Sequence, residues 1–267
     1  MKKHNLLSNL YTALVMLFLY APIAVLIVFS FNDSKSRNTW AGFTTHWYTD
    51  LFHDEEIISA LVLTLVVALV SSVIATVLGT SAAIGLNKMN KKLRSVFMTL
   101  NYLPMVNPDI IIGVSLMLLF TYLRIEFGVG TLILAHITFS VPYVVLNVMP
   151  KLRAMDKHIY DAALDLGCNP LQAYFKVVIP EIMPGILSGF VMALTLSIDD
   201  FVVSYFVNGP ASQTLPLVIY SQTRRRVTPK INALSTIIFI VVLGILVLNN
   251  FYSIRKEQQL RGKKGGH

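Results

Sequence analysis

Long apolar segments constrain this sequence more than any other feature. A helix needs about 20 consecutive apolar residues to cross the hydrocarbon core of a bilayer, and six segments of the chain reach this length. We therefore expect an all-α polytopic membrane protein with six transmembrane helices, in which residues 1–267 form a single transmembrane domain. The predicted membrane-spanning helices cover residues 10–30, 58–86, 96–123, 130–149, 184–208 and 233–254.

The composition excludes an ordinary soluble enzyme. Hydrophobic residues make up 55% of the chain and charged residues only 13%, whereas a soluble domain has about 25% charged residues. The single cysteine, Cys168, allows no intramolecular disulfide and no zinc site built from cysteines. Because the six histidines are scattered along the chain, we expect neither a metal centre nor a cofactor.

The net charge of +8 fits a membrane protein with both termini in the cytoplasm better than a nucleic-acid-binding protein. Lysine and arginine concentrate on the cytoplasmic side of membrane proteins, and this topology places most of the 22 bases inside. The first outer loop, 31–57, is rich in acids. The basic run Arg224–Arg226 is an exception to this rule, because the predicted topology places it on the outer side of the membrane. A solvated loop that faces lipid or a partner surface would explain it. The tail, 255–267, is expected to be disordered.

Three carboxylates fall inside the predicted spans: Asp109, Asp199 and Asp200. A charge at the centre of a bilayer costs at least about 2.5–3.5 kcal/mol, so intramembrane acids mark sites of function. No Lys or Arg lies within any of the six predicted spans. The counter-charge must therefore come from another chain, from a loop that folds in, or from a cationic substrate. Of the adjacent pair, one acid is expected to bond backbone or a neighbouring helix while the other faces the substrate path.

Asp109 and Asp199 are expected at similar depths in the membrane. At 1.5 Å per residue, each lies roughly 21–22 Å along its span from the cytoplasmic end. Pro104 and Pro108 predict a break beside Asp109, because proline removes a backbone donor. Asn107 has the form of an N-cap there, and Asp109 suits the positive end of a half-helix. That structural role does not exclude contact with a substrate.

Other polar and small residues in the spans predict contacts between helices. Interhelical hydrogen bonds are the default role of such polar side chains, here His136, Asn147, Asn249 and Asn250. Stretches of small residues let helices approach closely, and they occur at 71–72, 79–83 and 188–189.

The loop at 150–183 has more order than a linker. Asp156 predicts the cap of a short helix over 157–166, which Gly167 ends. Asn169 predicts the cap of a second helix over 170–178, which we expect to stop at Pro180, with Pro184 opening the fifth span. The apolar residues of this loop have no evident core of their own, which favours a docking element. They are Ile159, Ala162, Ala163, Leu166, Leu171 and Phe175.

A motif in this loop resembles the EAA loop of permeases of the binding-protein-dependent, type I (MetI-like) ABC importers. The segment 161–167 keeps the two alanines and the glycine of the family pattern, and 177–180 keeps its final proline. Three positions differ: Asp161 stands where the family has Glu, Val177 where it has Ile, and Ile179 where it has Leu. The resemblance implies a cytoplasmic coupling helix that seats in a groove of an ATPase subunit. The coupling residues it implies are Asp161, Ala162, Ala163, Gly167 and Pro180.

Further segments resemble the polyamine branch of this superfamily, which imports spermidine and putrescine. They are 107–109, 196–201, 208–210, 215–221 and 228–234. Lys230 departs from the branch, in which an acid is expected. The resemblance implies a permease subunit in the bacterial plasma membrane. Its implied partners are a second permease, two ATP-binding subunits and an extracytoplasmic substrate-binding protein.

Mechanism follows from these expectations. No GxxxxGK[ST] loop occurs in the chain, so ATP hydrolysis is expected on a separate subunit and the chain itself is not an enzyme. Asp109, Asp199 and Asp200 would receive the ammonium groups of a polyamine. Tyr205 and Tyr220 would offer cation–π faces, although tyrosines of the membrane interface have the same pattern.

Three alternatives stay open at this point. The same superfamily could carry another small amine, or an anion such as a phosphonate, which would sit badly against three acids. A proton-coupled secondary transporter of amines could use the same carboxylates, but it would need no docking loop. An aspartyl intramembrane protease is disfavoured because adjacent acids cannot converge from different helices, and neither acid segment carries the expected flanking residues.

Overall fold

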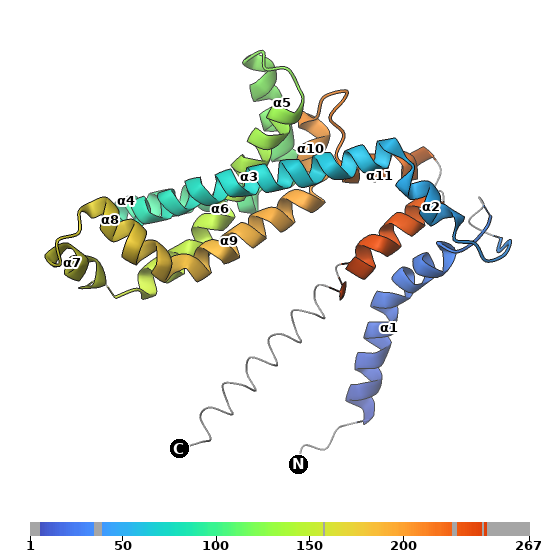
Figure 1. The fold of residues 1–267 in the computed structure, drawn as a ribbon, viewed down its shortest axis with the longest axis horizontal. Coiled ribbons are helices and arrows are strands. Elements are labelled where there is room, and N and C mark those ends of the chain that lie inside the picture. Colours follow the sequence, from blue (N-terminus) through green and yellow to red (C-terminus); the bar gives the residue numbers. More distant parts are fainter. Residues whose placement is uncertain (1–5, 35–38, 157, 226–228, 242, 245–267) are drawn as a thin grey trace. The chain divides into compact units, whose positions relative to one another are not determined.

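The computed structural model describes residues 6–34, 39–156, 158–225, 229–241 and 243–244. These residues form helices, with one isolated bridge between Asn32 and Phe43. The chain divides into two compact units, one made of residues 56–218 and the other of the described parts of 1–55 and 219–267. Figure 1 shows the helices, whose order is α1 (Leu6–Phe29), α2 (His46–Phe52), α3 (Glu55–Lys88), α4 (Lys91–Val106), α5 (Asp109–Tyr122), α6 (Val129–Ala154), α7 (His158–Asp165), α8 (Pro170–Ala173), the π-helix η1 (Tyr174–Val178), α9 (Ile179–Asp199), α10 (Val202–Val207) and α11 (Leu215–Arg225).

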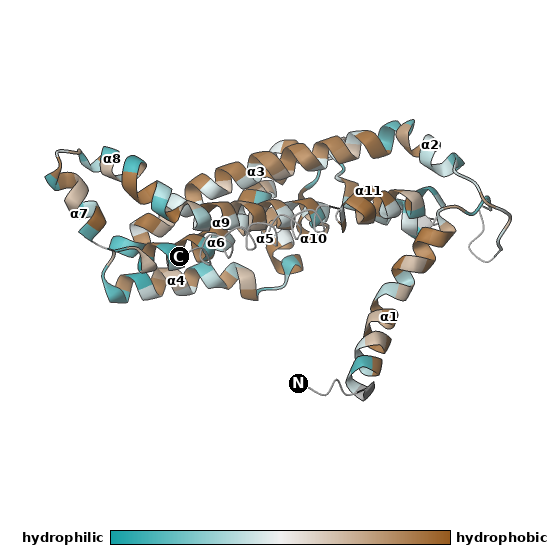
Figure 2. Cartoon of the chain, turned by 60° about the horizontal axis from the view of Figure 1, so that its bottom comes forward, coloured by the Kyte–Doolittle hydropathy of each residue, from teal (hydrophilic) through white to brown (hydrophobic). Residues whose placement is uncertain are grey.

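The multi-pass helical fold is confirmed, whereas six complete spans are not. Four helical segments of the described chain are long and apolar enough to cross a membrane, and the pair α4 and α5 brings the number to five if it forms one bent span. The sixth predicted span, 233–254, is described only in part, as the apolar helix Pro229–Val241. Asn249, Asn250 and the tail 255–267 lie outside the described residues. Figure 2 shows hydrophobic residues along the whole length of the long helices.

The third predicted span is broken at the expected place. Helices α4 and α5 meet at an angle of 102°. Asn107 ends α4 in an extended conformation, as expected for a residue before proline. The N-cap of α5 is Pro108 and not Asn107, and Asp109 is therefore the first residue of α5. The depth calculated for Asp109 along a straight helix is wrong for the same reason.

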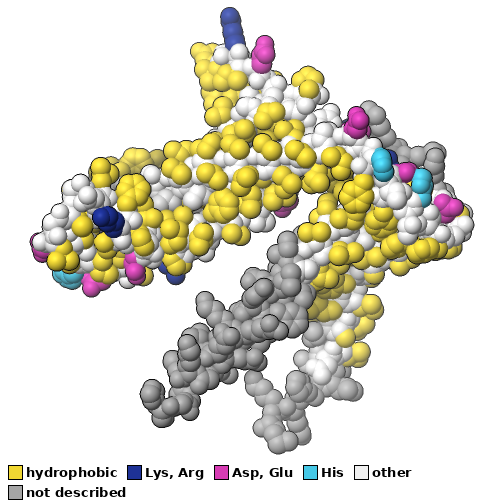
Figure 3. Space-filling view, in the orientation of Figure 1, with side chains coloured by type: hydrophobic (Ala, Val, Ile, Leu, Met, Phe, Trp, Pro, Cys, Tyr) yellow, Lys and Arg dark blue, Asp and Glu magenta, His cyan; other side chains and the backbone are white. Residues whose placement is uncertain are grey.

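The core of the 56–218 unit is built on close contacts between α3, α6 and α9. A Cβ atom added at Gly79 would lie 2.6 Å from Cβ of Val144, and one added at Gly189 would lie 3.2 Å from Cα of the same valine. Glycine lets helix backbones approach closely, so the predicted packing role of these small residues is confirmed. Figure 3 shows apolar side chains over the visible outer face of this unit, as expected for surfaces that meet lipid.

The 150–183 loop follows the prediction at its helix caps but not at its end. Asp156 accepts a hydrogen bond from the backbone of His158 at 3.0 Å, and Asn169 accepts one from Gln172 at 2.8 Å. Pro180, however, does not stop the second helix, and Pro184 lies inside α9 rather than at its start. The π-helical turn 174–178 accommodates the change, because backbone N–H of residue 179 bonds five residues back, to the carbonyl of residue 174. Helix α8 therefore runs through η1 into α9 without a corner.

The second unit explains the unusual lysine. Nζ of Lys230 donates a hydrogen bond to Oδ2 of Asp54 at 2.8 Å, and both side chains are largely covered. Elsewhere in this unit, Nε1 of buried Trp47 donates to the carbonyl of Asn32 at 2.8 Å and holds α2 to the chain after α1. The acid expected at position 230 is thus replaced by a base that has an acidic partner.

Candidate functional site

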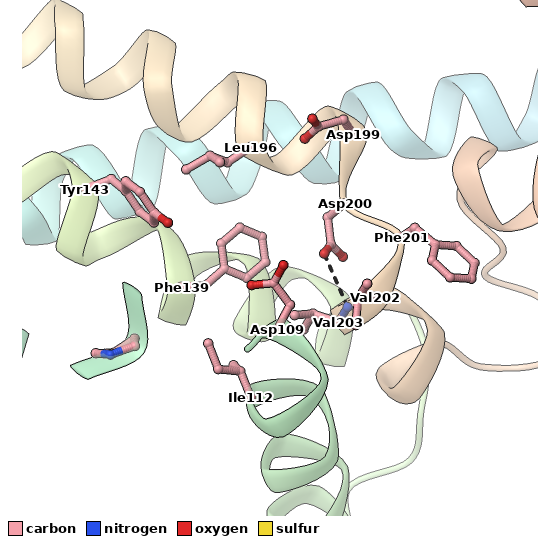
Figure 4. A pocket seen from close by; sticks show the side chains of 11 residues that line it. Asp109, Ile112, Phe139, Tyr143, Leu196, Asp199, Asp200, Phe201, Val202 and Val203 are labelled. Carbon is pink, nitrogen blue, oxygen red and sulfur yellow. Dashed lines mark hydrogen bonds between the residues drawn. The ribbon is translucent and has the colours of Figure 1, made fainter. Parts of the chain in front are cut away.

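The three acids of the predicted spans meet at one cavity of the 56–218 unit. The cavity has a volume of about 270 Å³. Asp109 reaches it from the first turn of α5, Asp199 from the last turn of α9, and Asp200 from the break between α9 and α10 (Figure 4). The remaining lining residues are Pro104, Ile112, Phe139, Tyr143, Leu196, Phe201, Val202 and Val203.

The two predicted tyrosines do not line this cavity. Tyr205 lies on α10, with half of its surface exposed, and its ring is tilted against that of Phe201 and meets that of Phe206 edge-on. Tyr220 belongs to the other unit. The aromatic side chains that do line the cavity are Phe139, Tyr143 and Phe201. Sequence analysis missed all three, because an aromatic residue in an apolar helix carries no signal that separates a lining position from a lipid-facing one.

Asp109 and Asp199 present exposed carboxylates. Among the described residues, neither forms an ion pair with a lysine or arginine. Asp109 is the first residue of α5, and Pro108 in the N-cap position offers no side-chain hydrogen bond. Both acids therefore keep acceptor oxygens that can receive an ammonium group.

Asp200 has a different environment and is half-buried. Its Oδ2 accepts hydrogen bonds from the backbone N–H and the hydroxyl of Ser204, at 2.8 and 2.7 Å. Its Oδ1 accepts one from the backbone of Val203 at 3.2 Å. Asp200 is thus tied to the first turn of α10, whereas Asp199 is exposed, and both carboxylates line the cavity.

A buried histidine stands behind Asp200. His136 of α6 is 1% exposed. Its Nδ1 lies 2.5 Å from Oγ of Ser197 on α9, and its Nε2 lies 3.0 Å from Oγ of Ser204 on α10. These contacts confirm the interhelical hydrogen bonding expected of this residue. Asn147 differs from the expectation, because its amide donates to the carbonyl of Tyr143 on its own helix.

The 150–183 loop brings its motif residues together on α7 and the segment that follows. Asp161, Ala162, Gly167 and Pro180 are exposed, whereas Ala163 is buried. Gly167 has a φ of 87°, a left-handed conformation that favours glycine at the end of a helix. Large apolar side chains of the loop stay uncovered: Leu166 is 87% exposed, Leu171 70% and Phe175 67%.

A cation–π contact links this loop to the end of α3. Nζ of Lys88 lies 4.9 Å from the ring centre of Tyr174 and 5.5 Å from that of Tyr160. The two rings are themselves 5.1 Å apart. The contact joins α3 to both α7 and η1, so a displacement of the loop would be felt by a membrane-spanning helix.

Comparisons with known proteins identify the class of protein that this fold and site define. Residues 75–255 match the family of the binding-protein-dependent transport system inner membrane component. The chain belongs to this family. It is a multi-pass membrane permease subunit of an ABC importer, it works with partner subunits, and it is not an enzyme.

The relatives in this family are permeases of polyamine systems. The chain is 40% identical over 251 residues to the putrescine transport system permease protein PotI of Escherichia coli K12, covering 91% of this chain and 89% of that protein. It is 37% identical over 254 residues to the spermidine/putrescine transport system permease protein PotC of the same strain, covering 95% and 96%.

Solved structures confirm the fold. A chain of a bacterial ABC transporter that imports the acidic polysaccharide alginate superposes with a TM-score of 0.69 at 18% sequence identity, covering 94% of this chain and 95% of that one. A bacterial alginate ABC transporter in complex with an alginate pentasaccharide-bound periplasmic protein gives a TM-score of 0.70 at 19% identity.

Proposed function

We propose that this permease subunit carries putrescine, spermidine or a close polyamine, and that the cavity lined by Asp109, Asp199 and Asp200 is its half of the substrate path. The observation that carries the proposal is the convergence of three acids on one cavity. Ammonium groups are the natural partners of such carboxylates, because each bond is both a hydrogen bond and a charge interaction. The relatives PotI and PotC, which are named as permeases for putrescine and for spermidine and putrescine, support the same cargo.

The charge of the cavity, rather than the fold, selects the cargo. The alginate importer shares this fold, yet its substrate is an acidic polysaccharide. Three acids around about 270 Å³ would repel a polyanion and attract a polycation. The rings of Phe139, Tyr143 and Phe201 add faces that attract ammonium groups by about 0.5–2 kcal/mol each where they are within reach. Tyr205 and Tyr220 stay proposals for positions along the path outside this cavity.

The loop is proposed to couple the permease to ATP hydrolysis. Its exposed apolar residues would seat in a groove of an ATP-binding subunit, with Asp161, Ala162, Ala163, Gly167 and Pro180 shaping the contact. The positive-inside rule then puts the loop and both termini in the cytoplasm. A second permease would complete the path in a heterodimer, two ATP-binding subunits would drive it, and an extracytoplasmic binding protein would deliver the polyamine. Alternating access would follow from rocking of the helices around the cavity.

Uptake into vesicles tests this function directly. The chain would be reconstituted with its partner permease, ATP-binding subunit and binding protein, and labelled putrescine and spermidine would be followed with and without ATP. We expect uptake that requires all four components. Uptake by the chain alone, driven by a proton gradient, would instead make it a secondary transporter. An ATPase-active complex that moves no polyamine would leave the permease class intact and refute the cargo.

A further inference from the structure

We propose that His136 is a positioning residue of the substrate path, which sets the direction of Asp200 through a chain of hydrogen bonds crossing four helices. The inference rests on the proposed function, since it assumes that Asp200 meets a cationic substrate. Ser71 of α3, Ser197 of α9, His136 of α6 and Ser204 of α10 form the chain, which ends at the carboxylate of Asp200.

With a neutral imidazole, the protons between Ser197 and Asp200 have one consistent arrangement. The Ser204 hydroxyl carries a single proton and donates it to Oδ2 of Asp200 at 2.7 Å. Its contact with Nε2 of His136, at 3.0 Å, must therefore use a proton on the imidazole. A neutral imidazole carries only one, so Nδ1 is an acceptor and takes the proton of Ser197 at 2.5 Å.

The far end of the chain is Ser71. The oxygen of Ser197 lies 3.2 Å from the oxygen of Ser71, whose hydroxyl also lies 3.3 Å from the carbonyl oxygen of Ala68 on its own helix. From Ser197 onward, the hydrogen bonds point toward Asp200. The side chain of His136 is 1% exposed, and a buried polar ring of this kind is stable only with both nitrogens satisfied. The histidine is therefore held in one orientation and one tautomer.

The hydrogen bonds of His136 lie where they can fix the geometry of the helix break beside Asp200. Ser197 precedes the break in the fifth predicted span and Ser204 follows it, so His136 bridges the two helix ends that flank Asp200 (Figure 4 shows the break). The ring also lies 5.1 Å from that of Phe139, which lines the cavity. The geometry of the break, and with it the direction of the acid, depends on this bridge.

These hydrogen bonds limit the number of acceptor sites that the Asp200 carboxylate can offer to a substrate. A carboxylate oxygen has about two acceptor sites. Both sites of Oδ2 are taken by Ser204, and one site of Oδ1 is taken by Val203. One acceptor site of Oδ1 remains for an ammonium group. Nε2 of His136 lies 3.6 Å from Oδ2, so the histidine stands behind the occupied oxygen and acts on the substrate only through Asp200.

The test compares two replacements of the histidine in the complete reconstituted system. His136→Leu removes both hydrogen bonds, whereas His136→Gln keeps an amide that can donate to Ser204. Polyamine uptake and ATP hydrolysis are measured together with saturating binding protein. We expect His136→Leu to lower uptake per ATP about fivefold, the effect of one lost hydrogen bond between neutral groups, and His136→Gln to recover most of it.

A matched control separates positioning from loss of folding. Thr131 also lies on α6, is 1% exposed, and donates across to the carbonyl of Val207 at 2.8 Å. Thr131→Val should lower the amount of assembled complex at most, with uptake per ATP unchanged. If His136→Leu fails to assemble, Ser204→Ala breaks the chain at its next link and should give the same loss of coupling.

A double-mutant cycle decides whether the histidine acts through Asp200. Residues that act as a unit give non-additive effects, so His136→Leu combined with Asp200→Asn should be no worse than the more severe single variant. Combined with Asp109→Asn, it should be additive. Additivity with both acids would overturn the positioning role. If Asp109→Asn and Asp199→Asn leave uptake unchanged, the cationic substrate path itself is refuted, which is a separate outcome.

Discussion

The acidic cavity and the 150–183 loop are specified in different ways. The cavity collects residues from α4, α5, α6, α9 and the start of α10, and its shape depends on contacts between helices far apart in the sequence. The loop is organised by neighbours: Asp156, Asn169 and Gly167 each act within a few residues of their own position. Next to the cavity, His136, Ser197 and Ser204 form a buried polar network, whereas the loop leaves Leu166, Leu171 and Phe175 exposed.

This difference shows what each region needs from the rest of the complex. A site that must hold a charge inside a membrane has to be fixed by the protein itself, because water cannot solvate misplaced groups there. A docking surface can stay incomplete until its partner covers it. The contact between Lys88 and the tyrosines of the loop connects the two regions through α3.

The largest effect is expected from disturbing the packing that holds the cavity. Gly79→Val would place Cβ within 2.6 Å of Cβ of Val144, and overpacking of this kind costs about 3 kcal/mol. We expect a marked loss of folded permease in a thermal unfolding assay. Gly85→Val on the same helix is the control, since nothing lies within 4 Å of its added Cβ. Equal losses for both variants would contradict the close packing.

Removing one charge from the cavity should have the next largest effect. Asp109→Asn and Asp199→Asn each remove a charge-assisted hydrogen bond, which is worth about 1.5–3 kcal/mol, so uptake should fall roughly tenfold or more. The complex should still assemble and hydrolyse ATP. Glu126→Gln, at an exposed position beyond α5 and outside the cavity lining, is the control and should transport normally. Unchanged uptake in both aspartate variants would remove the acids from the path.

Changing the exposed face of the loop should weaken assembly without unfolding the permease. Leu171→Asp adds a charge to a side chain that is 70% exposed, so the thermal stability of the isolated subunit should change by less than about 0.5 kcal/mol. Co-purification of the ATP-binding subunit should drop several-fold. The matched change is Ala173→Asp, which introduces the same charge at a fully buried position of α8 and should unfold the loop. Retention of the ATPase by Leu171→Asp would show that the loop docks elsewhere.

The smallest effect is expected at the link between the two regions. Lys88→Met removes a cation–π contact worth about 0.5–1 kcal/mol at an exposed site, while keeping the length of the side chain. Uptake per ATP should fall about twofold. Lys92→Met removes a nearby exposed base that has no ring contact among the described residues, and it should behave like the unchanged protein. If Lys88→Met takes up as much polyamine per ATP as the unchanged protein, the contact of Lys88 with the two tyrosines has no part in coupling.

Parts of the molecule that depend on local chemistry could be predicted from the sequence. The break at Pro108 follows from a missing backbone donor, and the caps at Asp156 and Asn169 follow from side chains that bond the next turn. The predicted stop at Pro180 was wrong, because a π-helical turn accommodated the proline and the helix continued into α9. The described residues do not explain the basic run 224–226, whose last residue lies outside them.

The sequence by itself determined the class of the protein. Apolar segments of membrane-spanning length and three acids without a basic partner in those segments follow from composition and spacing, which depend on the solvent that each residue needs. The loop motif was found through its resemblance to the family. Only the tertiary structure distinguished the environments of two neighbouring acids. Asp199 and Asp200 both line the cavity, yet the helix break leaves Asp199 exposed and ties Asp200 to Ser204 and, through it, to His136. Such a division depends on contacts across 61 and 68 residues of chain, which no local pattern encodes.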